Sequence, residues 1–278
     1  MTIDTHQHFW RYTSAEFDWI DDTMASIRRD FLPSDLLPLL AAAEVDATIA
    51  VQARQTLTET EWLLSLAKQH DFVRGVVGWV PLAKDDVEAT LQHLTADPKL
   101  IGVRHVLQGE PDDRFILGDA FNRGVSLLKK FDLRYDILIV ARQLQRTIEF
   151  VDRHPDQIFI VDHIAKPQIR AGEIADWRRD ITTLAERENV YCKVSGMVTE
   201  ADYGRWTPDG LKPYFDVVLS AFSPQRMMFG SDWPVCQVAA TYERWVQVVR
   251  SWTAELSAAE RAGIFGQTAL DAYGLTEK

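Results

Sequence analysis

The sequence predicts a single (β/α)₈ barrel, an α/β fold in which one domain spans residues 1–278. Eight short apolar runs alternate with single amphipathic helical segments, at intervals of roughly 25 to 45 residues. This alternation indicates a parallel sheet with right-handed crossovers, and the chain length is typical of one closed barrel. A doubly wound open sheet is the alternative, but the Gly-rich phosphate turn that such folds carry after the first strand is missing.

The predicted strands are the apolar runs that end before polar or turn-forming residues. After the N-terminal strand they cover residues 47–51, 73–80, 100–103, 135–140, 158–161, 190–194 and 226–229. The predicted helices cover residues 34–40, 58–70, 119–131, 143–153, 174–188, 211–222, 242–252 and 258–272, and one more begins at residue 85 or 86 and ends before Pro98. Two capping-box patterns, Thr58–Glu61 and Ser257–Glu260, mark helix starts, and Pro98 and Pro155 lie just beyond helix ends.

Composition excludes several classes of function. The net charge of −11 and the lack of any Lys/Arg-rich run argue against a nucleic-acid surface. No apolar stretch is long enough to cross a membrane, and no signal peptide precedes the first strand, so we expect a cytoplasmic protein. Cys192 and Cys236 lack metal-type spacing and should be reduced core residues. The sequence does not indicate an oligomeric state.

The first strand carries two histidines, His6 and His8. Because side chains alternate along a strand, both should leave the same face, together with Asp4 and opposite Ile3. Imidazole suits zinc and neighbouring metals, so this pair could chelate one ion. Two nearby histidines can equally be a coincidence, and the decision depends on which other groups meet them.

Polar side chains gather at the carboxyl ends of the predicted strands, where a (β/α)₈ barrel forms its active site. They are His6, His8, Gln52, Arg54, Trp79, Arg104, His105, Asp162, His163, Lys193, Ser195 and Asp232. Four of the seven histidines are among them, on three different strands. This convergence favours a functional role for His6 and His8.

Each other candidate has a structural alternative. Asp232 is a metal ligand or general base, or it caps a helix. His163 acts in the site, or it is a hydrogen-bonded core residue. Arg104 and His105 are strand neighbours, so only one can face inward, and the sequence does not decide which.

Three further candidates could bind substrate at the rim. Gln52, Arg54 and Trp79 either contact the substrate or pack and form ion pairs there. The orientation of Lys193 along its strand is similarly undecided.

Five segments together resemble the amidohydrolase superfamily of metal-dependent hydrolases, and within it the branch of sugar-lactone hydrolases. They are DTHQHFW at 4–10, GVRH at 102–105, DHIAKP at 162–167, CKVSGMVTEA at 192–201 and FGSDWPV at 229–235. The resemblance covers nearly the whole chain. It implies a barrel in which His6 and His8, with Asp232 as a further ligand, hold one divalent metal such as zinc, while Asp232 activates water.

Two departures from the family pattern affect the metal. Members with two metals carry a carboxylated lysine at the end of strand four, where this chain has Arg104 and His105. Members with one tightly held zinc usually add a histidine after strand five, and residues 135–143 contain none. We therefore do not expect two metals; the alternatives are one divalent metal such as zinc, bound weakly or dispensable, and a metal-independent site.

The resemblance implies hydrolysis of a small sugar lactone, such as L-fucono-1,5-lactone, L-rhamnonolactone or another aldonolactone, to its acid. Asp232 would then act as the base, with His163 or His105 assisting proton transfer, and Arg54 and Arg104 would bind the sugar. Gln52 and Trp79 are further candidates for substrate binding. The alternatives are a decarboxylase of the same superfamily and a sugar-acid binding protein without activity.

Overall fold

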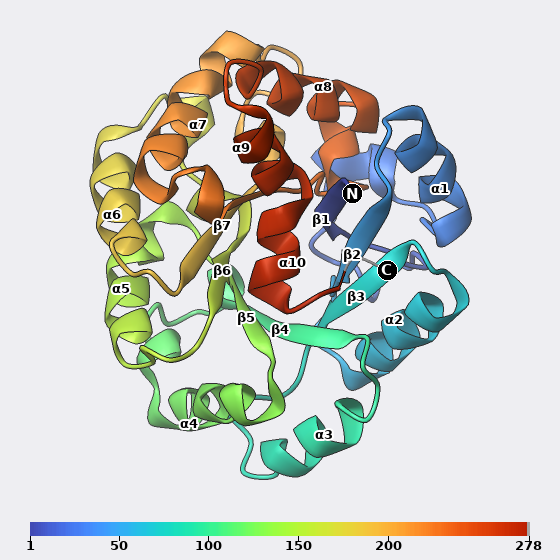
Figure 1. Cartoon of the computed structure of the whole chain (residues 1–278). Helices are drawn as coiled ribbons and strands as arrows, with labels where there is room; N and C mark the ends of the chain where they lie inside the picture. The colour runs from blue at the N-terminus through green and yellow to red at the C-terminus, as the bar shows by residue number, and fades with distance from the viewer. Residues whose placement is uncertain (277–278) are drawn as a thin grey trace.

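The computed structural model describes residues 1–276 and confirms the predicted barrel (Figure 1). Eight parallel strands pair in chain order in one sheet, and helices surround it. The strands are β1 Ile3–Gln7, β2 Ala47–Val51, β3 Val73–Gly78, β4 Leu100–Val106, β5 Arg134–Leu138, β6 Phe159–Val161, β7 Val190–Val194 and β8 Met227–Phe229.

The helices also follow the prediction, with shifted ends. They are α1 Pro33–Ala42, α2 Leu57–Gln69, α3 Val87–Leu94, α4 Asp119–Leu128, α5 Leu144–Asp152, α6 Ala175–Ala185, α7 Pro208–Phe222, α8 Tyr242–Trp252, α9 Ala258–Ala262 and α10 Thr268–Tyr273. The predicted cap of α2 was wrong, because Thr56 rather than Thr58 accepts the Glu59 amide. Ser257 caps α9 as predicted.

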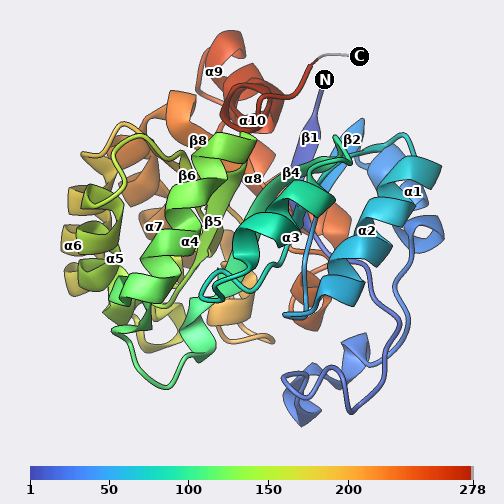
Figure 2. The same ribbon diagram turned by 90° about the horizontal axis from the view of Figure 1, so that it is seen from below.

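The last predicted helix is interrupted by a π-helical stretch, Gly263–Gln267, between α9 and α10. At Gly266 the chain passes so close to the N-terminus that an added Cβ would lie 2.1 Å from the Met1 carbonyl oxygen. The interruption turns α10 across the amino-terminal end of the barrel (Figure 2). There Ala269, Leu270 and Tyr273 pack on the apolar residues of the inner strand faces.

The segment between β1 and α1 lies at the opposite end of the barrel, where the strands finish (Figure 2). A larger apolar core fills the space between the sheet and the surrounding helices. Cys192 and Cys236 are free and buried, as predicted. Among residues 1–276, no helix has the length and apolar character needed to cross a membrane.

The predicted alternation along β1 was wrong at its start. Ile3 packs in the inner apolar cluster, whereas the Asp4 carboxylate accepts a hydrogen bond from Tyr242 of α8, outside the sheet, at 3.2 Å. Pairing with β2 is irregular between Asp4 and Gln7, and such a bulge changes which face the following residues take. Asp4 therefore does not share a face with His6.

The barrel is closed between β1 and the segment after β8. The Asp232 amide donates to the His6 carbonyl at 2.7 Å, and the His8 amide donates to the Trp233 carbonyl at 2.7 Å. Gln7 and Trp233 form a parallel bridge between these two bonds. The hydrogen bonds that close the sheet therefore involve three of the candidate site residues, His6, His8 and Asp232.

One glycine lets helix α4 pack closely against the loop that follows β3. A Cβ added at Gly124 of α4 would lie 2.0 Å from the backbone oxygen of Leu82, which follows β3. We expect Gly124→Ala to lower the free energy of unfolding by about 1–3 kcal/mol, because helix and loop must separate. Urea denaturation measures this loss. Gly109→Ala is the control, since its Cβ would meet only Val106, at 3.7 Å; equal stability of the two variants would contradict the packing argument.

Candidate active site

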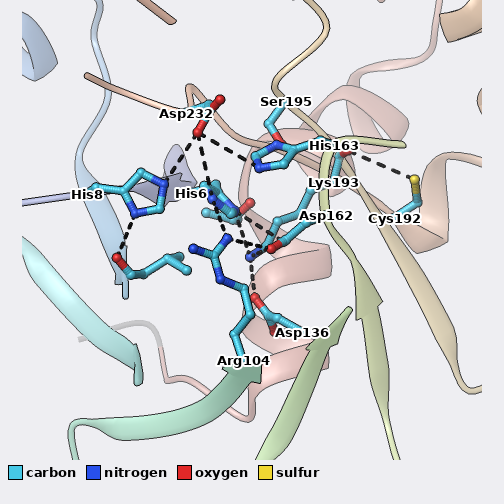
Figure 3. A network of polar contacts seen from close by, with 12 residues as sticks. His6, His8, Arg104, Asp136, Asp162, His163, Cys192, Lys193, Ser195 and Asp232 are labelled. Carbon is cyan, nitrogen blue, oxygen red and sulfur yellow. Dashed lines mark hydrogen bonds and ion pairs between the residues drawn. The ribbon is translucent and has the colours of Figure 1, made fainter. Parts of the chain in front are cut away.

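Three imidazoles surround the Asp232 carboxylate at the carboxyl ends of the strands (Figure 3). Asp232 Oδ1 lies 3.4 Å from Nε2 of His8 and 3.9 Å from Nε2 of both His6 and His163. All four side chains are buried. Because the three Nε2 atoms converge on one oxygen, the structure brings these predicted residues together.

The other nitrogen of each ring is held by a partner behind it. His8 Nδ1 lies 2.8 Å from the Val51 carbonyl, which can only accept, so His8 carries its proton there and leaves Nε2 free. His6 Nδ1 faces Asp162 Oδ1 at 3.2 Å, and His163 Nδ1 faces the Ser195 hydroxyl at 2.8 Å. Outer partners of this kind orient metal-binding histidines.

Burial sets the protonation of these groups. It lowers the pKa of His6 and of His163 well below the usual range, so both rings are neutral at neutral pH. Burial by itself would raise the pKa of Asp232, but the neighbouring His163, His8 and Lys166 outweigh it and hold that pKa below its usual value. The site therefore presents the neutral imidazoles of His6 and His163 and an ionised carboxylate.

Beneath His6 lie two cations and two carboxylates (Figure 3). Asp162 accepts a hydrogen bond from Arg104 at 2.9 Å and forms an ion pair with Lys193 at 3.1 Å, and Lys193 also contacts Asp136. These four charges balance, which leaves the negative charge of Asp232 without a matching cation among them. The inward orientation of Lys193, which the sequence left open, is thereby resolved.

This donor set fits one divalent ion. Ligand atoms of His6, His8 and Asp232 lie within 4.8 Å of one another, and so do those of His6, Asp162 and His163. Imidazole nitrogen with carboxylate oxygen is a common set for zinc. Arg104 Nη1 lies 3.3 Å from His6 Nε2, so its positive charge borders the same nitrogen that faces Asp232.

Arg104, not His105, faces the site. The Arg104 guanidinium contacts the backbone oxygen of Gln52 and lies 3.3 Å from its side-chain oxygen, so Gln52 holds Arg104 in place. His105 points to the outer face of β4, where it lies 2.7 Å from Glu110 and receives the indole N–H of Trp79 at 3.3 Å. Strand neighbours point to opposite faces, and the structure therefore does not bring His105 and Trp79 to the cluster.

A cavity of about 750 Å³ opens above Asp232. His8, Arg104 and His163 line it together with Arg54, which forms an ion pair with Glu16. Trp19 lines it too, whereas Phe9 and Trp233 are fully buried and do not.

Sequence reasoning missed several residues of the cavity wall. Lys166 and Glu200 form an ion pair at 3.3 Å, and both line the cavity with Tyr203 and Gln108. Lys166 and Glu200 belong to the quoted DHIAKP and CKVSGMVTEA segments, which was the available signal. Their loops are positioned by contacts far away in sequence, so spacing along the chain could not place them.

Left-handed backbone presents two of the site residues. Residues 163–166 have φ of 54°, 49°, 59° and 47°, and Asp232 has φ of 58°. For residues with a Cβ this conformation costs about 1–2 kcal/mol each, and such strain is concentrated at functional sites. Gly196, with φ of 62°, lies against His163, and a Cβ there would come within 2.6 Å of its ring.

A family model described as amidohydrolase matches residues 3–275, and the chain belongs to this family. It is 41% identical over 288 residues to an L-fucono-1,5-lactonase of Burkholderia multivorans, covering 100% of this chain and 97% of that protein. An L-rhamnono-gamma-lactonase of Scheffersomyces stipitis is 27% identical over 63% of this chain and 59% of its own length.

A solved amidohydrolase structure from Burkholderia multivorans, described as having bound zinc, superposes with a TM-score of 0.95. Its sequence is 41% identical to this chain, and the match covers 99% of this chain and 100% of that one. Sequence identity and structural similarity therefore both support the barrel fold and the assignment of the chain to the amidohydrolases.

The clustering predicts which histidines bind metal. We expect His8→Ala to weaken zinc binding by at least about 10–100-fold, because it removes one nitrogen from the group formed with His6 and Asp232. Equilibrium dialysis with metal analysis measures this affinity. His105→Ala removes an imidazole that lies at a strand end but outside the cluster, and should bind zinc as the wild type does; an equal loss in both variants would contradict the assignment.

A buried carboxyl group shapes the loop that carries Arg54. Glu59 Oε2 accepts the amides of Ala53 at 3.0 Å and Arg54 at 2.7 Å, and burial raises the pKa of Glu59 to about 7. Because the folded state holds this proton up to a higher pH than the unfolded chain, ionisation lowers the free energy of unfolding as pH rises from about 4.5 to 7.

Glu59→Gln keeps an oxygen for both amides and cannot ionise. Its stability relative to the wild type should therefore increase by about 2–3 kcal/mol over this pH interval, as measured by urea denaturation at several pH values. Glu61→Gln, at an exposed position of the same helix, is the control. If both variants follow the wild type in parallel, Glu59 does not titrate as stated.

Proposed function

We propose that the protein hydrolyses the ester bond of a small sugar lactone, of the L-fucono-1,5-lactone class, and releases the sugar acid. The observation that carries this proposal is the ionised Asp232 carboxylate facing three imidazole Nε2 atoms at the floor of a sugar-sized cavity. The lactonase names of relatives that match the chain support the choice of substrate.

Lactone hydrolysis needs an activated water, charge stabilisation at the carbonyl oxygen and a proton for the departing ring oxygen. Asp232 is the proposed base, since its low pKa keeps it ionised and the residue lines the cavity. After attack, the same carboxyl group returns the proton to the ring oxygen as the ring opens.

His6, His8 and Asp232 would hold the divalent metal. A metal bound there would polarise the carbonyl and make water more acidic. His163 lies beside this group with its Nδ1 against the Ser195 hydroxyl. When that hydroxyl donates to Nδ1, His163 carries its proton on Nε2 and can donate it toward the negative charge that develops on the carbonyl oxygen.

Arg104 contributes a fixed positive charge at the cavity floor. Its guanidinium is held by Asp162 and Gln52, so it is already oriented before substrate enters. Higher in the cavity, Trp19 and Tyr203 offer flat surfaces for a sugar ring, and the Lys166–Glu200 pair offers donors and acceptors for hydroxyl groups. A neutral polyhydroxy ring suits this mixture of aromatic and paired charged side chains.

The experiment is a pH-indicator screen of a lactone panel that includes L-fucono-1,5-lactone and L-rhamnono-gamma-lactone, with and without chelator. We expect acid release without CO₂, and loss of activity in chelator that added zinc restores. A decarboxylase would instead release CO₂ from a carboxylated substrate, and a binding protein would show no turnover. Failure to hydrolyse any lactone of the panel would overturn the proposal.

Asp232→Asn tests the base directly. The amide cannot accept the proton of water, so kcat should fall by about 10²–10⁴-fold in the same screen. Asp85→Asn is the control, because this aspartate lies on the surface in an ion pair with Arg123. If Asp232→Asn keeps its turnover while folded, Asp232 is not the base.

A further inference from the structure

Three neighbouring strand ends of the site turn through left-handed backbone, and a side chain binds one carbonyl in or beside each turn. After β6, the Ile164 carbonyl accepts the indole N–H of Trp177 at 2.8 Å. After β7, the Gly196 carbonyl accepts the Thr199 hydroxyl at 2.7 Å. After β8, the Gly230 carbonyl accepts the indole N–H of Trp245 at 2.9 Å.

The two tryptophans approach the site from outside the barrel. Trp177 belongs to α6 and Trp245 to α8, both in the layer of helices that surrounds the sheet (Figure 1). Their side chains are buried, with exposed fractions of 4% and 0%, and neither lines the cavity. Each ring has one polar group, which when buried requires an acceptor, and in both cases that acceptor is backbone next to a site residue.

The carbonyls of Ile164 and Gly230 lie in or next to the segments of left-handed backbone. Ile164 lies inside the left-handed run 163–166, directly after His163. Gly230 precedes Ser231 and Asp232, and Asp232 itself is left-handed. Left-handed residues with a Cβ persist only where the surrounding structure holds them, so loss of either hydrogen bond should let the segment relax and move the side chain it presents.

We propose that Trp177 and Trp245 are positioning residues of the active site, whose indole N–H groups hold the backbone that presents His163 and Asp232. Trp177 supports His163, which takes part in the reaction but not in the metal group of His6, His8 and Asp232. Trp245 supports Asp232, which takes part in the reaction and is also a member of that metal group. The kinetic part of this inference rests on the proposed lactonase function; the metal-binding and exchange parts do not.

Replacement by phenylalanine removes the N–H and keeps most of the apolar ring. Trp206→Phe is the matched control, since Trp206 is also buried and donates its indole N–H at 2.9 Å, but to the Ala239 carbonyl, outside the three turns. Losses of stability that follow from removing any buried indole hydrogen bond will appear in all three variants. Effects on kcat or on zinc affinity should appear only in Trp177→Phe and Trp245→Phe.

We expect Trp177→Phe to lower kcat about tenfold with KM within about twofold and zinc affinity unchanged. Trp245→Phe should lower kcat and also weaken zinc binding about tenfold, since Asp232 is a ligand. Trp206→Phe should keep wild-type kcat and zinc affinity. If Trp177→Phe and Trp245→Phe match Trp206→Phe in these measurements, the inference is wrong.

Hydrogen exchange reports the first turn without any activity. The Lys166 amide donates to the His163 carbonyl at 2.8 Å across the left-handed run, so its exchange should accelerate in Trp177→Phe and not in Trp206→Phe. If no lactone is hydrolysed by the wild type, the proposed function fails, while this exchange and the zinc affinity of Trp245→Phe still decide the inference.

Gly196→Ala disturbs His163 by a second route that leaves Trp177 intact. The added Cβ would meet the ring at 2.6 Å and displace it. Gly172→Ala is its control, because Gly172 has a similar φ of 70° but nothing within 4 Å of the added Cβ. We expect lower kcat for Gly196→Ala alone, with zinc affinity unchanged. Unchanged kcat would show that the orientation of His163 is unimportant, and would overturn the role of Trp177.

Discussion

The arrangement of the candidate site depends on two backbone hydrogen bonds between β1 and the segment after β8. The Asp232 amide bonds to the His6 carbonyl, and the His8 amide bonds to the Trp233 carbonyl. These bonds close the sheet into a barrel, and they join the first strand to the segment after the last strand, which together carry the proposed metal ligands. Closure of the fold and assembly of the site are therefore one event, because His6 and His8 meet Asp232 only when the first strand pairs beside the last.

Charge balance below the histidines is the second constraint. Arg104 and Lys193 share Asp162, and Lys193 also contacts Asp136, all buried inside the barrel. Burying four charges is costly unless each finds its partner in good geometry, and removing one would leave an uncompensated charge. This network fixes His6 from below and leaves Asp232 as the charge available for a cation or a proton.

Periodicity and strand ends were sufficient to predict the barrel and to bring His6, His8, His163 and Asp232 to one place. They failed at Asp4, because a bulge in β1 breaks the alternation. They could not choose between Arg104 and His105, since a shift of one residue reverses the faces of a strand. Lys166 and Glu200 lie on loops that long-range contacts position. The left-handed run at 163–166 contains no glycine, so the sequence has no residue that would predict it.

The helix α10 has a consequence for how the protein is made. The Tyr273 hydroxyl donates to both oxygens of Asp136, at 2.9 and 2.8 Å, from the end of the barrel opposite the cavity. During synthesis, β1 through β8 leave the ribosome before this tyrosine, so until then Asp136 has Lys193 as a hydrogen-bond donor but lacks the tyrosine hydroxyl. The nascent chain can form its sheet early, but the polar floor of the site is complete only when the final helix arrives.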